Sequence, residues 1–381
     1  MFFQKVWRKN LLIVLLFSCS SLFAQEDSSH LRVSLLTCGT GPEPWETFGH
    51  TAIRITDSMS GTDDVFNYGT FNGYDDDFLL NFTRGKLLYY LSYYPYPNFV
   101  DEYARDNRSV REQELKISGK DKMEIYNFLL HNARNENKYY KYDFFFDNCA
   151  TRIRDAFPKA LGSGFKYAYT LPEHKSISFR NIINQYFYRV HWQRFGVNIL
   201  LGSRIDKVMT NSDVMFLPDY LADGIAGATL DGRKIAHPSK LIVDGSPKVP
   251  AGVNEPFLLT SFIALLTILG LSVPRLKRLG NVMIFFNLFL SGFIGCFIML
   301  MWMATDHQGC SNNLNLLWAL PTNLVAAFIP RRNNERYSLI AMGLIFVSLL
   351  LHILKVQELP ILELSPLLLS LLTVHSFKYK R

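Results

Sequence analysis

Two side chains in this sequence have the chemistry of a nucleophile and its base, Cys149 and His50. Asn148 precedes the cysteine, and apolar residues recur after it at helical spacing, at Ile153, Phe157 and Leu161. Because asparagine is a preferred N-cap, the pattern predicts a helix that begins at Cys149. Backbone amides and the macrodipole at a helix N-terminus favour the thiolate, which makes Cys149 the candidate nucleophile. The alternative is that Cys149 is a small buried hydrophobic residue.

His50 follows Phe48-Gly49 and opens an alternating segment, which predicts a strand that starts at the histidine. An imidazole in contact with a thiol takes its proton, and the imidazolium then holds the thiolate. In an ordinary papain-like enzyme the cysteine comes first. The reversed order here favours a circularly permuted papain-like fold. The alternative for His50 is an ordinary core or surface histidine.

The elements that must position these two residues form an α+β pattern over residues 25–254. A capping box at Ser118–Asp121 predicts a helix, and an aromatic strand is expected directly before the Cys149 helix. A hairpin around Asp231-Gly232 and a linker at residues 244–250 follow. The other expected strands are residues 31–38, 65–71 and 110–117.

The N-terminus predicts export. Lys5, Arg8 and Lys9 precede an apolar run, and a small-residue cleavage site follows, so residues 1–24 are expected to be a signal peptide. Cys19 offers the alternative of a lipidated cysteine. Among the other cysteines, Cys38 and Cys310 could pair, although their spacing does not require it. The sequence has no metal-ligand pattern and no Gly-rich phosphate loop, so neither a metal nor another cofactor is expected.

Residues 255–381 are expected to form a membrane domain of about five spanning helices. Hydrophobic residues make up 49% of the 381-residue chain, and the long apolar runs all come after Pro256. Much of the net charge of +7 lies in alternate short loops between these runs, so that every basic loop falls on the cytoplasmic side, as the positive-inside rule requires. The chain is therefore expected to be a multi-pass inner-membrane protein with a periplasmic N-terminal domain and no nucleic-acid surface. The runs are residues 257–273, 282–304, 314–329, 338–354 and 359–374.

Two further segments are candidates for lipid contact. Aromatic residues crowd residues 78–97 beside Arg84 and Lys86, a composition that suits an acyl-chain groove or a headgroup interface, or simply an aromatic core. The polar loop 305–315 faces outward between the second and third runs. We expect its His307 and Asn312 to lie near the site of reaction, the alternative being a solvated connector.

The combination of motifs resembles the Lnb-type lipoprotein N-acyltransferases of Gram-negative bacteria, in both the periplasmic and the membrane domain. The resemblance covers most of the mature chain and is more specific than any single motif. It is carried by residues 48–54, 67–71, 84–86 with Tyr89, 147–152, His307, 313–318 and Pro321.

The resemblance implies that Cys149 accepts a fatty acyl chain from a phospholipid, with His50 as its base, and passes it to the α-amine of diacylglyceryl-cysteine in an apolipoprotein. Tyr68 is the expected third group that orients His50. Asn148 is expected to cap the helix or to help form an oxyanion hole, and Arg152 to support the site. Two other functions remain open. One is a membrane-tethered cysteine hydrolase acting on lipids or cell-wall peptides, and the other is a non-catalytic module that binds lipid or lipoprotein.

Overall fold

The computed structural model describes residues 30–43, 46–73, 77–171, 176–246, 252–329 and 335–377. The expected signal peptide, including Cys19, lies outside the described residues, as do most of the linker before the membrane domain and the basic residues of the C-terminal tail.

A seven-stranded antiparallel sheet forms the centre of the exported domain. β1 and β2 occur where the sequence predicts them, and β2 begins at His50. The crowded aromatic segment supplies β4, whereas the predicted aromatic strand before Cys149 shrinks to three residues of β6 followed by a turn. The strand order is β10 (Lys240–Val243), β5 (Val110–Glu114), β1 (Leu31–Cys38), β2 (His50–Asp57), β3 (Thr62–Thr70), β4 (Leu88–Pro95) and β6 (Tyr139–Lys141).

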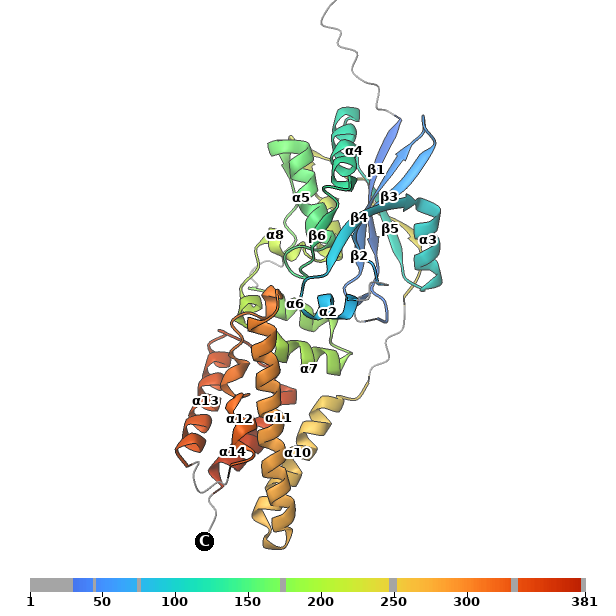
Figure 1. The fold of residues 1–381 in the computed structure, drawn as a ribbon. Coiled ribbons are helices and arrows are strands. Elements are labelled where there is room, and N and C mark those ends of the chain that lie inside the picture. The colour runs from blue at the N-terminus through green and yellow to red at the C-terminus, as the bar shows by residue number, and fades with distance from the viewer. Residues whose placement is uncertain are drawn as a thin grey trace, which may run out of the picture.

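Helices cover both faces of the sheet (Figure 1). α4 (Gly119–Ala133) and α5 (Cys149–Leu161) lie on one face, where Ile53 and Phe66 of the sheet pack in one core with Ile153 and Phe157. α3 (Tyr96–Arg105) lies on the other face, over Cys38 and Ala52. Since successive strand residues point to opposite faces, each buried strand supplies side chains to both cores. This is the expected α+β class.

A helical segment connects the sheet to the membrane helices. It contains α6 (Phe179–Tyr186), α7 (His191–Leu200), α8 (Asn211–Val214) and α9 (Pro218–Ala226), beside a small sheet of β7 (Phe165–Lys166), β8 (Thr229–Leu230) and β9 (Arg233–Lys234). Phe195 and Ile199 of α7 share an apolar cluster with Trp318 of the membrane domain. Arg180, 1% exposed, pairs with Asp206 and donates to the carbonyls of Asn198, Leu201 and Gly202. These bonds satisfy a buried guanidinium and fix the end of α7.

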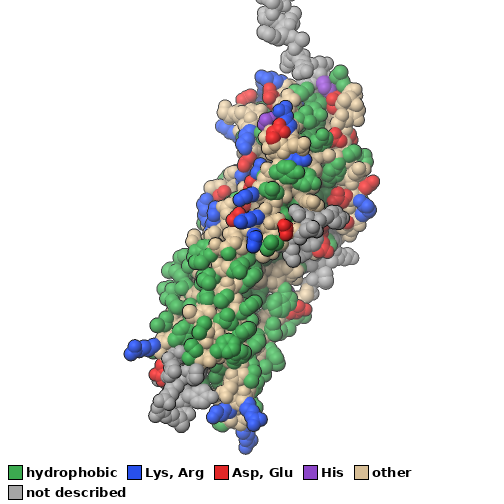
Figure 2. Space-filling view, viewed as in Figure 1, with side chains coloured by type: hydrophobic (Ala, Val, Ile, Leu, Met, Phe, Trp, Pro, Cys, Tyr) green, Lys and Arg blue, Asp and Glu red, His purple; other side chains and the backbone are tan. Residues whose placement is uncertain are grey.

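Three helices in the described part of the chain are long and apolar enough to cross a membrane. They are α10 (Glu255–Ser272), α11 (Lys277–Met303), which a 3-10 turn from Pro274 precedes, and α13 (Glu335–Ile353). α14 (Ile361–Ser376) is apolar but shorter. Hydrophobic side chains cover the surface of this half, with Lys and Arg gathered at its far end (Figure 2). That distribution suits a membrane domain whose basic loops lie on the side opposite the sheet.

The third predicted span is not a continuous helix. Residues 314–329 form a 3-10 turn, an irregular segment and the short α12 (Thr322–Ala326), which lie against α11. Gly292 and Gly295 permit the contact, because a Cβ at either would meet backbone of this segment at about 2 Å. Within the irregular stretch, the Trp318 indole N–H donates a hydrogen bond to Asn315 Oδ1. The Asn323 amide of α12 donates to the Ser291 hydroxyl of α11 and so connects the two helices. Broken backbone at membrane depth is tolerated where it is buried in protein.

The disulfide between Cys38 and Cys310 that the sequence left possible is not formed. Both cysteines are buried and free, one beneath α3 and the other in the outer loop of the membrane domain.

Candidate active site

The start of α5 is built to present Cys149. The Asn148 side chain accepts the Thr151 N–H at 2.9 Å, and the Thr151 hydroxyl accepts the Asn148 N–H at 2.7 Å, which completes a capping box. The Asn148 amide also donates to the carbonyls of Phe144 and Phe216. Asn148 is therefore the N-cap, as predicted, and its amide hydrogens are already used, which leaves none for an oxyanion.

Gly49 allows β2 to begin at His50. It has a φ of 72°, and a Cβ there would lie 2.6 Å from the Cys38 carbonyl oxygen. Only glycine accommodates both the left-handed backbone and this close approach. The neighbouring loop is held by Arg108, whose guanidinium pairs with Glu46 at 2.9 Å and bonds the Gly39 carbonyl.

Cys149 and His50 are both partly exposed, and their side chains form a hydrogen-bonded pair. Burial raises the pKa of Cys149, but the His50 charge, its hydrogen bond and the backbone N–H groups of Thr51 and Ala150 together lower it below the ordinary value. Burial lowers the pKa of His50, but the Cys149 charge and hydrogen bonds to Cys149 and Asn67 outweigh this and raise it. Each residue thus favours the charged form of the other, a thiolate beside an imidazolium.

Asn67, and not Tyr68, is the group that orients His50. The His50 Nε2–H donates to Asn67 Oδ1 at 2.6 Å, which leaves Nδ1 for the thiol. Ala52 and Asn67 are opposite positions of β2 and β3 by the register that pairs Ile53 with Phe66, so Asn67 and His50 share one face. The expectation for Tyr68 is wrong because neighbouring strand residues point to opposite faces. A slip of one residue in this register would present Tyr68 instead, so the folded sheet, and not the sequence, decides between them.

Tyr68 lies instead in the core under α5, where its ring contacts Tyr140 with centroids 6.3 Å apart. The Arg152 guanidinium covers the Tyr140 ring at 4.1 Å and pairs with Asp147 through Nη2 and Oδ2 at 2.6 Å. Arg152 therefore braces the first turn of α5 against β6, next to Cys149.

Gly69 faces the pair directly. Its φ is 98°, and an added Cβ would lie 3.8 Å from both the Cys149 Cβ and the His50 Cε1. We expect Gly69→Ala to lower activity on the order of 100-fold, because the methyl group occupies the space beside the reacting atoms, and to destabilise the fold by about 1–3 kcal/mol through backbone strain. Gly61→Ala is the matched control: its φ is 74° and nothing lies within 4 Å of its Cβ. Equal activity loss in both variants would contradict this reading.

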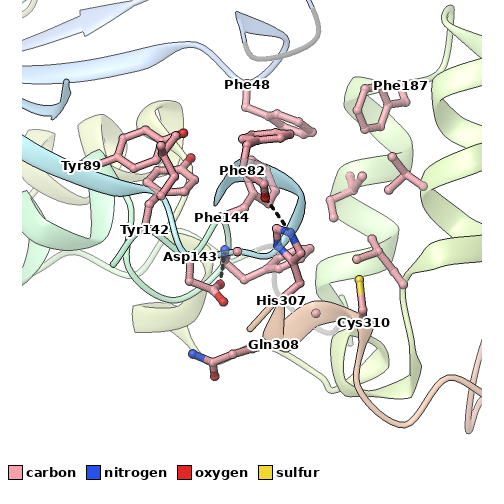
Figure 3. Close-up of a pocket in the computed structure, with 17 residues that line it drawn as sticks. Phe48, Phe82, Tyr89, Tyr142, Asp143, Phe144, Phe187, His307, Gln308 and Cys310 are labelled. Carbon is pink, nitrogen blue, oxygen red and sulfur yellow. Dashed lines mark hydrogen bonds between the residues drawn. The ribbon is translucent and has the colours of Figure 1, made fainter. Parts of the chain in front are cut away.

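A cavity of about 360 Å³ lies between the sheet domain and the outer loop of the membrane domain (Figure 3). Neither Cys149 nor His50 lines it, but Phe48 and Tyr142, neighbours of the pair, do. The Tyr142 ring stacks on Tyr89 with centroids 4.2 Å apart. Burial and then the Cys149 charge raise the pKa of Tyr142. Tyr142 lines the cavity and packs against the same core cluster as Cys149.

His307 lines this cavity and contacts the exported domain; its expected place near the reacting atoms stays a prediction. Its Nε2–H lies 3.1 and 3.2 Å from the carbonyls of Phe82 and Thr83, while the Asp306 N–H donates to the Arg84 carbonyl at 2.8 Å. Gly85 packs on His307 with no room for a side chain.

The other predicted lipid-contact residues are not at the cavity. Arg84 and Lys86 are exposed on the neighbouring loop. Asn312 is exposed with a φ of 54°, its carbonyl accepts hydrogen bonds from Ser203, and it does not line the cavity.

Comparison with known proteins yields two family matches. The model described as the Lnb N-terminal periplasmic domain matches residues 20–185, which include His50, Asn67 and Cys149. The model described as the Lnb transmembrane domain matches residues 250–380, which include His307. Together they span well over half of the chain. No curated protein and no solved structure matches it.

Proposed function

The chain belongs to the Lnb-type lipoprotein N-acyltransferase family, and we propose that it moves a fatty acyl chain from a phospholipid to the α-amine of diacylglyceryl-cysteine through a thioester on Cys149. Family membership makes it a multi-pass membrane protein with a periplasmic N-terminal domain that modifies lipoproteins. The chemistry assigned to Cys149 is our inference.

One observation carries the proposal: Cys149, His50 and Asn67 are connected in series, and the cysteine lies at a helix N-terminus with a lowered pKa. A cysteine, an imidazole and an amide in this order also occur in papain-like enzymes. The likeness supports a permuted papain-like fold, which stays a prediction.

In the first step, the Cys149 thiolate attacks the ester carbonyl of the phospholipid. The tetrahedral intermediate collapses to a thioester, and the lysophospholipid alcohol leaves with the proton held by the His50 imidazolium. In the second step, the α-amine of the acceptor attacks the thioester. Neutral His50 takes a proton from the amine, an amide forms, and the thiolate–imidazolium pair is restored. An unperturbed α-amine has a pKa near about 8, so a nearby base is useful at neutral pH.

Mass spectrometry of lipoprotein N-termini in cells with and without the protein tests the proposal. We expect an amide-linked acyl chain when the protein is present and a free α-amine when it is absent. A hydrolase would leave the N-termini unchanged and release free fatty acid from phospholipid. A non-catalytic binding module would change neither product.

A further inference from the structure

We propose that the cavity between the two domains holds the acyl chain that is being transferred, and that its walls set the chain length the protein prefers. This inference rests on the proposed function and adds a site and a selectivity to it. The cavity is the space lined by Phe48, Tyr142, Ile183, Val197, Leu201 and Cys310 among others (Figure 3).

The lining selects for an uncharged chain. Aromatic and aliphatic side chains form most of it, and none of the described lining residues is Lys or Arg. Among the described lining residues Asp143 is the only carboxylate, and it is already bonded by the N–H groups of Phe145 and Phe146 at 2.9 and 3.1 Å. A phosphate headgroup would meet this acid with no Lys or Arg in the described lining to balance it, whereas each buried methylene gains free energy. The volume is also within the usual range for a small-ligand site.

The position of the cavity suits a chain whose ester lies at Cys149. Phe48 comes two residues before His50, and Cys149 and Tyr142 both pack, partly buried, against the core cluster that contains Phe48. A chain attached to the sulfur can therefore pass Tyr142 and Phe48 to reach the interior. Only the carbonyl end of the acyl chain would lie beside Cys149 and His50.

Both domains contribute walls, so the site exists only when they are joined. Val197 and Leu201 come from the α7 segment, and Gly309 and Cys310 come from the outer loop of the membrane domain. Gly309 lies against Phe145, where an added Cβ would approach the ring to 2.7 Å. The Gly202 N–H donates to the Gly309 carbonyl at 2.9 Å and holds this wall in place. The lipid-facing domain thus completes the acyl site.

Val197→Phe tests the site, because the larger side chain would fill part of the cavity. Gln193→Phe is the matched control, since Gln193 lies on the same helix, is exposed and does not line the cavity. Val197→Leu is a milder variant in case the phenylalanine disturbs folding, and thermal unfolding of all three checks this. Burial of one methylene group contributes about 0.8 kcal/mol. Each methylene of the acyl chain that the larger side chain keeps out of the cavity should therefore weaken binding of the chain about fourfold.

The first measurement needs no catalysis. Full-length protein carrying Cys149→Ala is placed in nanodiscs with a phosphatidylethanolamine whose palmitoyl chain ends in a diazirine. On irradiation we expect crosslinks at Leu201 and Cys310, with a yield at least about tenfold lower after Val197→Phe and unchanged after Gln193→Phe. Crosslinks confined to the outer surfaces of the membrane helices would overturn the proposal.

The second measurement uses Cys149 as it is and follows the acyl-enzyme by intact mass. With Val197→Phe, thioester formation from a palmitoyl phospholipid should fall at least about tenfold, while formation from an octanoyl phospholipid should stay within about twofold. A normal thioester followed by slow transfer to a lipopeptide would assign the cavity to the acceptor and overturn our proposal. If no donor gives a thioester on unmodified protein, the proposed function fails instead, and the crosslinks still report on the cavity.

Discussion

Replacing Cys149 with alanine is expected to abolish acyl transfer, with a loss on the order of 10⁵-fold or more. The sulfur receives the His50 hydrogen bond and the N–H groups of Thr51 and Ala150. Without it, the acyl group has no covalent carrier between the two lipids. In the unmodified protein, phospholipid alone should yield a hydroxylamine-sensitive adduct on Cys149 that disappears when a diacylated lipopeptide is added. Intact-protein mass spectrometry measures both events.

The variant should remain folded, because the helix cap is formed by Asn148 and Thr151 and does not use the thiol. Cys296→Ala is the control: this cysteine is free, lies in α11 and does not line the cavity, so its loss should leave transfer unchanged. Transfer that continues in the Cys149 variant would exclude the thioester relay.

His50→Ala should slow transfer by about 10²–10⁴-fold and move the pH dependence of thiol reactivity upward. The imidazolium is a principal cause of the lowered Cys149 pKa, so its removal returns that pKa towards or above the ordinary value of 9.0. At pH 7 an unassisted thiol is only a few per cent ionised, and iodoacetamide alkylation should therefore slow by more than about tenfold and recover at alkaline pH. Alkylation rates measured across pH test this directly.

In the unmodified protein, the thiolate–imidazolium pair is favoured because the pKa of Cys149 is lowered and the pKa of His50 is raised. Thioester formation should slow at pH values below the pKa of Cys149, because the sulfur is then protonated. It should also slow above the pKa of His50, because His50 then has no proton for the leaving alcohol. With Asn67→Ala, thioester formation should begin to fall at a lower alkaline pH, because the lost hydrogen bond lowers the pKa of His50. Asn67→Asp keeps the acceptor and should restore the alkaline limb. An identical pH profile in the unmodified protein and both Asn67 variants would contradict the pairing of these groups.

The sequence was sufficient where structure depends on nearby residues. Asn148 and Thr151 are three positions apart, so their capping box and the helix that starts at Cys149 could be predicted locally. The strand that begins at His50 and the long apolar helices follow from alternation and hydropathy in the same way. The aromatic segment before Cys149 was mispredicted as a strand. Its hydrophobicity outweighed the turn signal of Asp143, which bonds the N–H groups of Phe145 and Phe146.

Only the tertiary structure decided which distant groups meet. Asn67 reaches His50 through strand register, and a shift of one residue would have presented Tyr68 instead. The third apolar run breaks because Gly292 and Gly295 let its backbone approach α11, a contact that its own hydropathy does not reveal. The cavity needs walls from two domains far apart in the chain. Local patterns encode caps, turns and burial within a few residues, whereas the pairing of distant surfaces depends on how the whole core packs.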